Sequence, residues 1–97
     1  MKVIVREAAE HDLHRIFDWI TQDNPAAASR MVARIRDRIN FLELDSLSNM
    51  GRPGLEPGTR ELIEYPYIIV YEVHRDRGEV EVLAIVHGAM DRESKDE

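Results

Sequence analysis

Two amphipathic helical stretches, separated by a break of only three residues, fill most of the first half of the sequence. In the first stretch, apolar residues recur at helical spacing: Ala9, Leu13, Ile16, Phe17 and Ile20. The second predicted helix covers residues 25–44, and its apolar positions project within about 100° of one another: Ala28, Met31, Val32, Ile35, Ile39 and Leu42. Asn24 suits the N-cap and Pro25 the first turn of this second helix. So short a link predicts an antiparallel helical hairpin.

The remaining periodic segments alternate in the manner of β-strands. We expect strands over residues 2–6, 59–64, 67–73 and 79–87, and a Gly/Pro-rich loop over residues 46–58. In the last strand, alternation puts four residues on one face, namely Val80, Val82, Ala84 and Val86, with Leu83 and Ile85 on the other. The order β-α-α-β-β-β predicts an α+β fold, with an N-terminal strand and a helical hairpin packed on a small, mostly antiparallel sheet.

Composition narrows the class of protein. The 97 residues suit a single domain over residues 1–97, in which we expect residues 89–97 to form a loose polar tail. No cysteine is present, which excludes disulfides, thiolate zinc sites and a cysteine nucleophile. With no signal peptide or membrane span recognisable in the sequence, we expect a cytoplasmic protein that does not enter membranes.

The charge distribution argues against nucleic-acid binding. The net charge is -6, and residues 61–97 hold four basic and ten acidic groups. Because neutralisation of phosphates supplies most of the affinity for nucleic acids, we expect no sequence-specific nucleic-acid binding.

The histidines offer little recognisable chemistry. His11 and His14, with Asp18 one turn further on, are expected on a solvated helix face rather than at a metal site, and His74 is expected at a surface turn. His87 ends the last strand, so it serves either a structural role or, less favoured, that of a general acid or base. We expect no metal site and no cofactor.

The arginines form a more regular pattern. Arg30, Arg34 and Arg38 recur every four residues beside the apolar face of the second helix, which makes them either a solvated rim or an anchoring row for carboxylates or phosphates. Arg60 opens the second predicted strand. Arg52 lies in the glycine-rich loop, which lacks the Gly-Lys-Ser/Thr of a phosphate-binding P-loop.

Several short segments together resemble the RelE/ParE superfamily of type II toxin–antitoxin toxins, and specifically its ParE-like branch. They are Asp12-Leu13 with Ile16, Asn24-Pro25-Ala26-Ala27-Ala28, Met50-Gly51-Arg52-Pro53-Gly54, Gly58-Thr59-Arg60-Glu61-Leu62, Tyr65-Pro66-Tyr67-Ile68-Ile69-Val70-Tyr71, and Val86-His87-Gly88-Ala89. The resemblance spans Val3 to about Asp91 and implies the same fold as the periodicity. It also implies a toxin held inactive by a cognate antitoxin in a hetero-oligomeric complex. ParE-like members inhibit DNA gyrase, whereas RelE-like members cleave mRNA on the ribosome.

The resemblance and the residue pattern together suggest where partners bind. We expect a ParD-like antitoxin to contact Trp19, Arg30, Arg34, Arg38, Phe41 and Arg60, with acidic groups meeting the arginines and the two aromatic side chains acting as anchors. The surface for the target would include Arg52, His87 and Arg92.

The ParE-like interpretation needs no catalytic residues, because gyrase itself cuts the DNA. In the RelE-like alternative, Arg60, His87 and Arg92 would be catalytic. A third possibility is a degenerate relative that only binds a partner. The acidic charge and the His-Gly context of the last strand favour the ParE-like interpretation.

Overall fold

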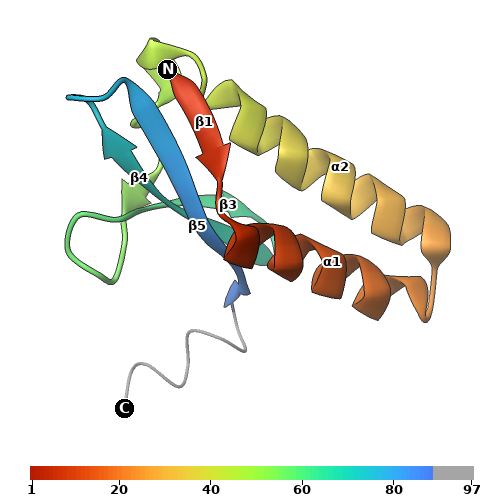
Figure 1. Cartoon of the computed structure of the whole chain (residues 1–97). Helices are drawn as coiled ribbons and strands as arrows, with labels where there is room; N and C mark the ends of the chain where they lie inside the picture. Colours follow the sequence, from red (N-terminus) through yellow and green to blue (C-terminus); the bar gives the residue numbers. More distant parts are fainter. Residues whose placement is uncertain (89–97) are drawn as a thin grey trace.

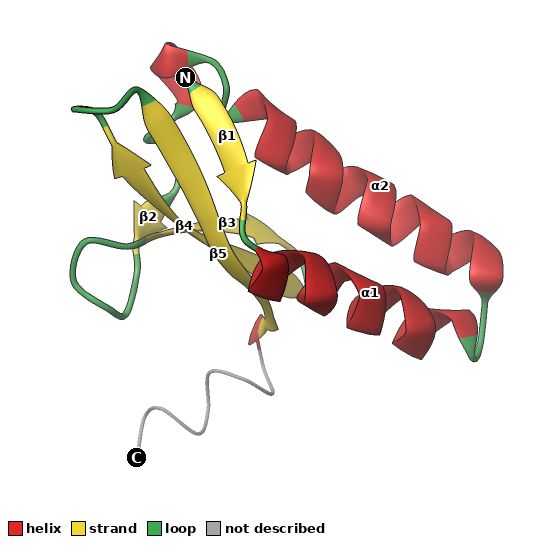
Figure 2. Cartoon of the chain, in the orientation of Figure 1, coloured by secondary structure: helices red, strands yellow, loops and turns green. Residues whose placement is uncertain are grey.

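The computed structural model describes residues 1–88 and arranges them as two helices packed on one face of a five-stranded sheet (Figures 1 and 2). In chain order the elements are β1 Lys2–Val5, α1 Glu7–Thr21, α2 Pro25–Phe41, the 3₁₀ turn η1 Asp45–Leu47, β2 Arg52–Pro53, β3 Arg60–Glu64, β4 Tyr67–His74 and β5 Glu79–His87. The sheet order is β1-β5-β4-β3-β2, with β1 parallel to β5 and the other pairs antiparallel. The predicted α+β fold and its β-α-α-β-β-β order are confirmed, while the expected tail at 89–97 lies outside the described residues.

The helical hairpin forms where the sequence predicted it. The Asn24 side chain accepts a hydrogen bond from the Ala27 amide at 3.1 Å, and Pro25 is the first helical residue. Arg36 of α2 binds Glu10 of α1 at 2.8 Å across the hairpin. Neither helix is long and apolar enough to cross a membrane, and this holds for every helix within residues 1–88.

The core lies between the hairpin and the sheet. From the helices, Leu13, Ile35 and Ile39 are buried against Ile69 and Tyr71 of β4, the strand at the centre of the sheet. Phe17 was expected on the buried stripe, but it is 38% exposed, so that prediction is wrong.

Two boundary predictions are also corrected. α2 ends at Phe41 rather than at residue 44, because Leu42, Glu43 and Leu44 bond to carbonyls three residues back in turns. The supposed loop over residues 46–58 contains part of η1 and the short strand β2, which pairs with β3 through Arg52↔Glu61 and Pro53↔Arg60. A strand of two residues is too short to show an alternation, so periodicity did not reveal β2.

The face assignment predicted for the last strand fails halfway along it. Val70 pairs with Ala84 while Tyr71 pairs with Val82, so Leu83 is an extra residue in a β-bulge. The bulge shifts the alternation by one residue, and Ile85 joins Val82 in the core in place of Ala84.

Candidate functional site

A groove of about 350 Å³ opens where α1 meets the ends of β4 and β5. Its walls come from two helical turns of α1 and from the sheet residues beside them: Asp12, Arg15, Ile16, Trp19, Tyr67, Ile85 and His87. The mixture of aromatic rings, an aliphatic floor and a few polar groups is typical of a binding surface.

The groove owes its position to the shortness of β1. β1 pairs only with residues 79–82 of β5, so the next part of β5 has no neighbouring strand on that side within residues 1–88. α1 takes the place of the strand, since the Asp12 carboxylate accepts a hydrogen bond from the Ile85 amide at 2.9 Å. Arg15 donates to the other oxygen of the same carboxylate at 2.6 Å. Asp12 therefore fixes α1 against β5 and defines the back of the groove.

His87 and Tyr67 form the aromatic end of the groove. Their ring centroids are 5.5 Å apart and the rings stand at 86°, an edge-to-face contact between paired residues of β5 and β4. Burial raises the pKa of the Tyr67 hydroxyl, so the phenol stays neutral at physiological pH. This packing supports the structural role weighed for His87, and it places the ring at the rim of a binding groove.

Trp19 supplies the largest exposed apolar surface beside the groove. Its side chain is 68% exposed on α1, near the level of His87 and Tyr67. The structure thus brings together Trp19, expected to meet the antitoxin, and His87, expected to meet the target. One ligand in this groove would contact both residues.

The arginine row on α2 divides into two parts. Arg30 and Arg34 are exposed on the helix surface, as an anchoring row requires. Arg38 is half-buried and donates to the Ile63 carbonyl at 3.1 Å, while its Nε lies 3.6 Å from Glu64. Arg38 therefore fastens α2 to β3. Phe41 follows at the end of α2 and is 49% exposed.

Arg60 has a structural position at the start of β3, four residues along the sheet from the level of His87. Its guanidinium donates to the carbonyls of Asn49 and Gly51, and so holds the segment before β2 against β3. The Tyr71 hydroxyl accepts a hydrogen bond from the Gly51 amide at 3.0 Å from the other side. A Cβ on Gly51 would lie 2.5 Å from the Glu61 carbonyl oxygen, so the close approach of these two backbones requires glycine.

Arg52 lies beside Arg60, on β2. Its guanidinium is largely exposed and binds the Glu61 carboxylate at 3.2 Å, while the Glu61 side chain is only 2% exposed. A buried carboxylate needs such a cation, because burial without one is costly. Arg52 therefore has a structural role alongside any contact with a target.

The three residues of the alternative catalytic set do not assemble within the described chain. Arg60 is aligned with Tyr71 and His87 with Tyr67, so the two are four residues apart along β4, about 13 Å at 3.3 Å per residue. Since β3 and β5 also lie on opposite sides of β4, about 10 Å apart, the Cα atoms are roughly 16 Å from each other. Arg92 lies outside the described residues.

Several residues that shape these sites gave no sequence signal. The hydrogen bonds of Asp12 and Tyr71 reach across the fold to residues far along the chain, and no local pattern reveals them. His74 was expected at a surface turn, but it is half-buried at the end of β4 between Glu72 and Glu81. His11 and His14 are exposed on α1, as predicted.

Comparison with known proteins supplies the identity of the fold. The family model described as "ParE toxin of type II toxin-antitoxin system, parDE" matches residues 3–92. A protein of Sinorhizobium fredii, described as "Putative toxin Y4kP", is 43% identical over 77 residues, in an alignment that covers 77% of this chain and 75% of the relative.

Two solved structures share the fold. A chain of the chromosomal ParDE system of P. aeruginosa superposes with a TM-score of 0.77 at 26% identity, covering 90% of this chain and 95% of that one. A chain of the RelBE2 toxin–antitoxin complex of Mycobacterium tuberculosis gives 0.65 at 21% identity, covering 89% and 95%, and shows likeness of fold alone. Since the family model spans nearly the whole sequence, the resemblance noted from its motifs is confirmed, and the chain belongs to the ParE toxin family of type II toxin–antitoxin systems, within the RelE/ParE superfamily.

Proposed function

We propose that this toxin is neutralised by a ParD-like antitoxin and, when released, inhibits DNA gyrase. The observation that carries the proposal is the ParE family match over residues 3–92, because ParE-like toxins act on gyrase. The chromosomal ParDE system of P. aeruginosa, which shares the fold, supports a ParD-like partner.

The geometry of the described residues favours this target over ribosomal mRNA. Arg60 is occupied by backbone carbonyls, His87 packs on Tyr67, and about 16 Å separates their Cα atoms along and across the sheet. The bonds to the Asn49 and Gly51 carbonyls hold the Arg60 guanidinium in place, so it does not join His87 at one scissile phosphate, where catalytic groups need to lie within hydrogen-bond reach of the reacting atoms. The net charge of -6 also opposes docking into ribosomal RNA.

The antitoxin would bind two exposed regions that the fold leaves available. Trp19 projects beside the groove between α1 and the sheet, and offers the aromatic anchor that tight interfaces use. Arg30 and Arg34, exposed on α2, offer cations for acidic groups of the antitoxin, while Phe41 extends the apolar surface at the end of that helix. Arg38 and Arg60 contribute indirectly, because both guanidinium groups are fastened to backbone carbonyls.

Binding measurements with the cognate antitoxin test this surface. We expect Trp19→Ala to weaken affinity by about 30-fold, the loss of a central aromatic anchor, and Arg34→Glu to weaken it by about tenfold. Arg75→Glu is the matched control, since Arg75 is an exposed arginine on the β4–β5 turn, away from α2. Equal affinity of Arg34→Glu and Arg75→Glu for the antitoxin would reject the role of the α2 arginines.

Expression in cells tests the target. Induction of the toxin alone should produce filamentous cells with an SOS response, and co-expression of the antitoxin should restore growth. Arrested translation with cleaved transcripts, without an SOS response, is the outcome that would establish the RelE-like alternative instead.

A further inference from the structure

The face of the sheet opposite the helices carries a cluster of three metal-ligating side chains. Val73 and Val82 point toward the helices, so Glu72 and His74 of β4 and Glu81 of β5 lie on the other face. Glu72 is directly opposite Glu81 in the β4–β5 ladder, and His74 is two residues further along on the same side. The cluster therefore stands on two paired strands near the centre of the sheet.

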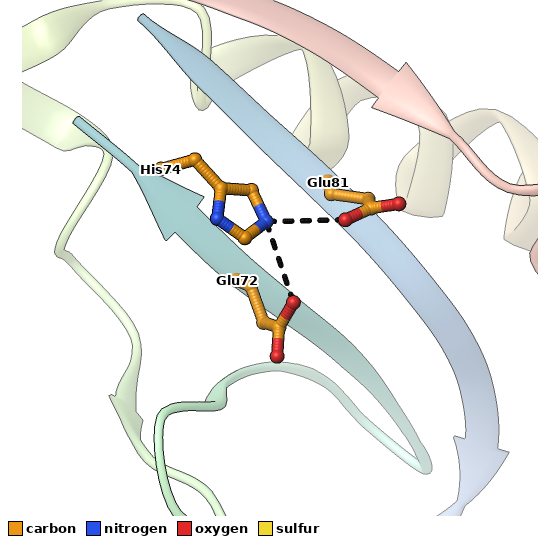
Figure 3. Close-up of side chains that lie close together, drawn as sticks. All are labelled: Glu72, His74 and Glu81. Atoms are coloured by element: carbon orange, nitrogen blue, oxygen red, sulfur yellow. Dashed lines mark hydrogen bonds and ion pairs between the residues drawn. The ribbon is translucent and has the colours of Figure 1, made fainter. Parts of the chain in front are cut away.

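The three side chains point toward one another (Figure 3). The Nε2 atom of His74 lies 3.1 Å from a Glu81 oxygen and 3.3 Å from a Glu72 oxygen. One ligand atom from each of the three residues lies within 4.8 Å of the other two, and all three residues are half-buried. A tetrahedral Zn²⁺ with bonds of about 2.0–2.2 Å keeps neighbouring ligand atoms about 3.3–3.5 Å apart, which is close to both measured separations.

We infer that Glu72, His74 and Glu81 form a binding site for a divalent transition-metal ion, and that Zn²⁺ is the ion it prefers. One imidazole nitrogen and two carboxylate oxygens are ligands that Zn²⁺ accepts, and three protein ligands leave a fourth position for water. The imidazole discriminates against Mg²⁺, which prefers oxygen ligands alone.

The charges around the cluster favour a cation between the two carboxylates. Directly opposed carboxylates such as Glu72 and Glu81 destabilise a strand pair unless positive charge lies between or beside them. Arg6, at the end of β1, donates to the other oxygen of Glu81 at 2.6 Å, and this bond, followed by that from His74, lowers the pKa of Glu81. Arg6 thereby orients the second oxygen of Glu81 toward His74, as an outer-shell partner does at a metal.

The other charged groups near the cluster are already partnered or sit one position away. Glu79 binds Arg77 at 3.1 Å, and Lys2 is aligned with Glu79 rather than with Glu81. The formal charges of Glu72, Glu81 and Arg6 sum to −1, and a divalent ion makes the cluster positive by one.

The test is a titration of the purified full-length chain with ZnCl₂ at pH 7.5, followed by calorimetry and by thermal unfolding. We expect one ion per chain, and a folded-to-unfolded ratio about 100-fold higher when free Zn²⁺ is 100 times its dissociation constant. His74→Gln and Glu72→Gln should each weaken Zn²⁺ binding at least tenfold while the circular dichroism stays native, because neither side chain belongs to the core between the helices and the sheet.

Two control variants distinguish the cluster from general surface binding. Glu79→Gln removes a neighbouring carboxylate on the same face, and His14→Gln removes an exposed histidine on α1; both should bind Zn²⁺ like the wild type. The inference requires saturable Zn²⁺ binding. Its absence would overturn the inference and would mean that His74 serves only as an ion-pair partner. Equal stabilisation by MgCl₂, or unchanged affinity in His74→Gln, would likewise overturn it. No outcome depends on gyrase or on toxicity, so this inference and the proposed function stand or fall separately.

Discussion

Replacement of Asp12 by alanine tests how the groove is built. In the folded chain the Asp12 carboxylate accepts hydrogen bonds from the Ile85 amide, two residues beyond the bulge of β5, and from the Arg15 guanidinium. Without it the Ile85 amide loses its acceptor, and a hydrogen bond to a charged group contributes about 1.5–3 kcal/mol. Alanine has the higher helix propensity by about 0.6 kcal/mol, which offsets part of this loss. We therefore expect Asp12→Ala to lower the free energy of unfolding by about 1–2.5 kcal/mol.

For a domain of this size, such a loss corresponds to a fall in Tm of roughly 5–15 °C, measured by calorimetry. Asp18→Ala is the matched control, because Asp18 is exposed on the same helix and shares the gain in helix propensity. Asp12→Asn should fall between the two, since its amide oxygen still accepts one hydrogen bond. If Asp12→Ala and Asp18→Ala unfold within about 0.5 kcal/mol of each other, Asp12 does not fix α1 to β5, and the account of the groove is wrong.

Three further predictions concern the rest of the scaffold. Tyr71→Phe leaves the Gly51 amide without its acceptor, so it should cost about 1–3 kcal/mol of stability and speed hydrogen exchange at that amide, with unchanged exchange as the contrary result. Gly51→Ala should destabilise the fold more than Tyr71→Phe, because the alanine Cβ would clash with the Glu61 carbonyl oxygen. Equal stability of Gly51→Ala and the wild type in urea would show that the backbone at residue 51 shifts at no cost. Arg36 lowers the pKa of Glu10 below its ordinary 4.5, so this ion pair stabilises the fold above that pH and its contribution is lost as pH falls through the lowered value. Glu10→Gln should accordingly cost about 0.3–1 kcal/mol at pH 7 and nothing in strong acid, and a pH-independent difference in urea unfolding would contradict this assignment.

The sequence predicted the elements whose signals are local. The helical periodicity of α1 and α2, the Asn24–Pro25 start of α2 and the four predicted strands all depend on residues close together in the chain, and the structure confirms them. The strand β2 is too short to show an alternation, and the bulge after Val82 depends on the register between β4 and β5, so periodicity alone did not reveal them.

The same distinction explains the outcome for the candidate sites. Four side chains are exposed as predicted, because of their places on the helices: Trp19, Phe41, Arg30 and Arg34. Arg38 has a similar position on the helix but is half-buried, because it donates to the Ile63 carbonyl of a strand 25 residues away.

Pairs of residues that lie far apart in the sequence or meet across two strands show the limit of sequence-based prediction more clearly. Asp12 and Ile85 are 73 residues apart in the chain, and Glu72 meets Glu81 only through the register of β4 and β5. Such pairs follow from the three-dimensional packing of the sheet, and spacing in the sequence carries no trace of them.

The most direct test of the central claim compares two purified reactions. The toxin is added to a DNA gyrase supercoiling assay, and separately to a translating extract in which transcripts are followed by length. The account predicts that supercoiling stops and cleaved DNA bound to gyrase accumulates, that transcripts stay intact, and that prior addition of antitoxin reverses the inhibition. Shortened transcripts with undiminished supercoiling would contradict it.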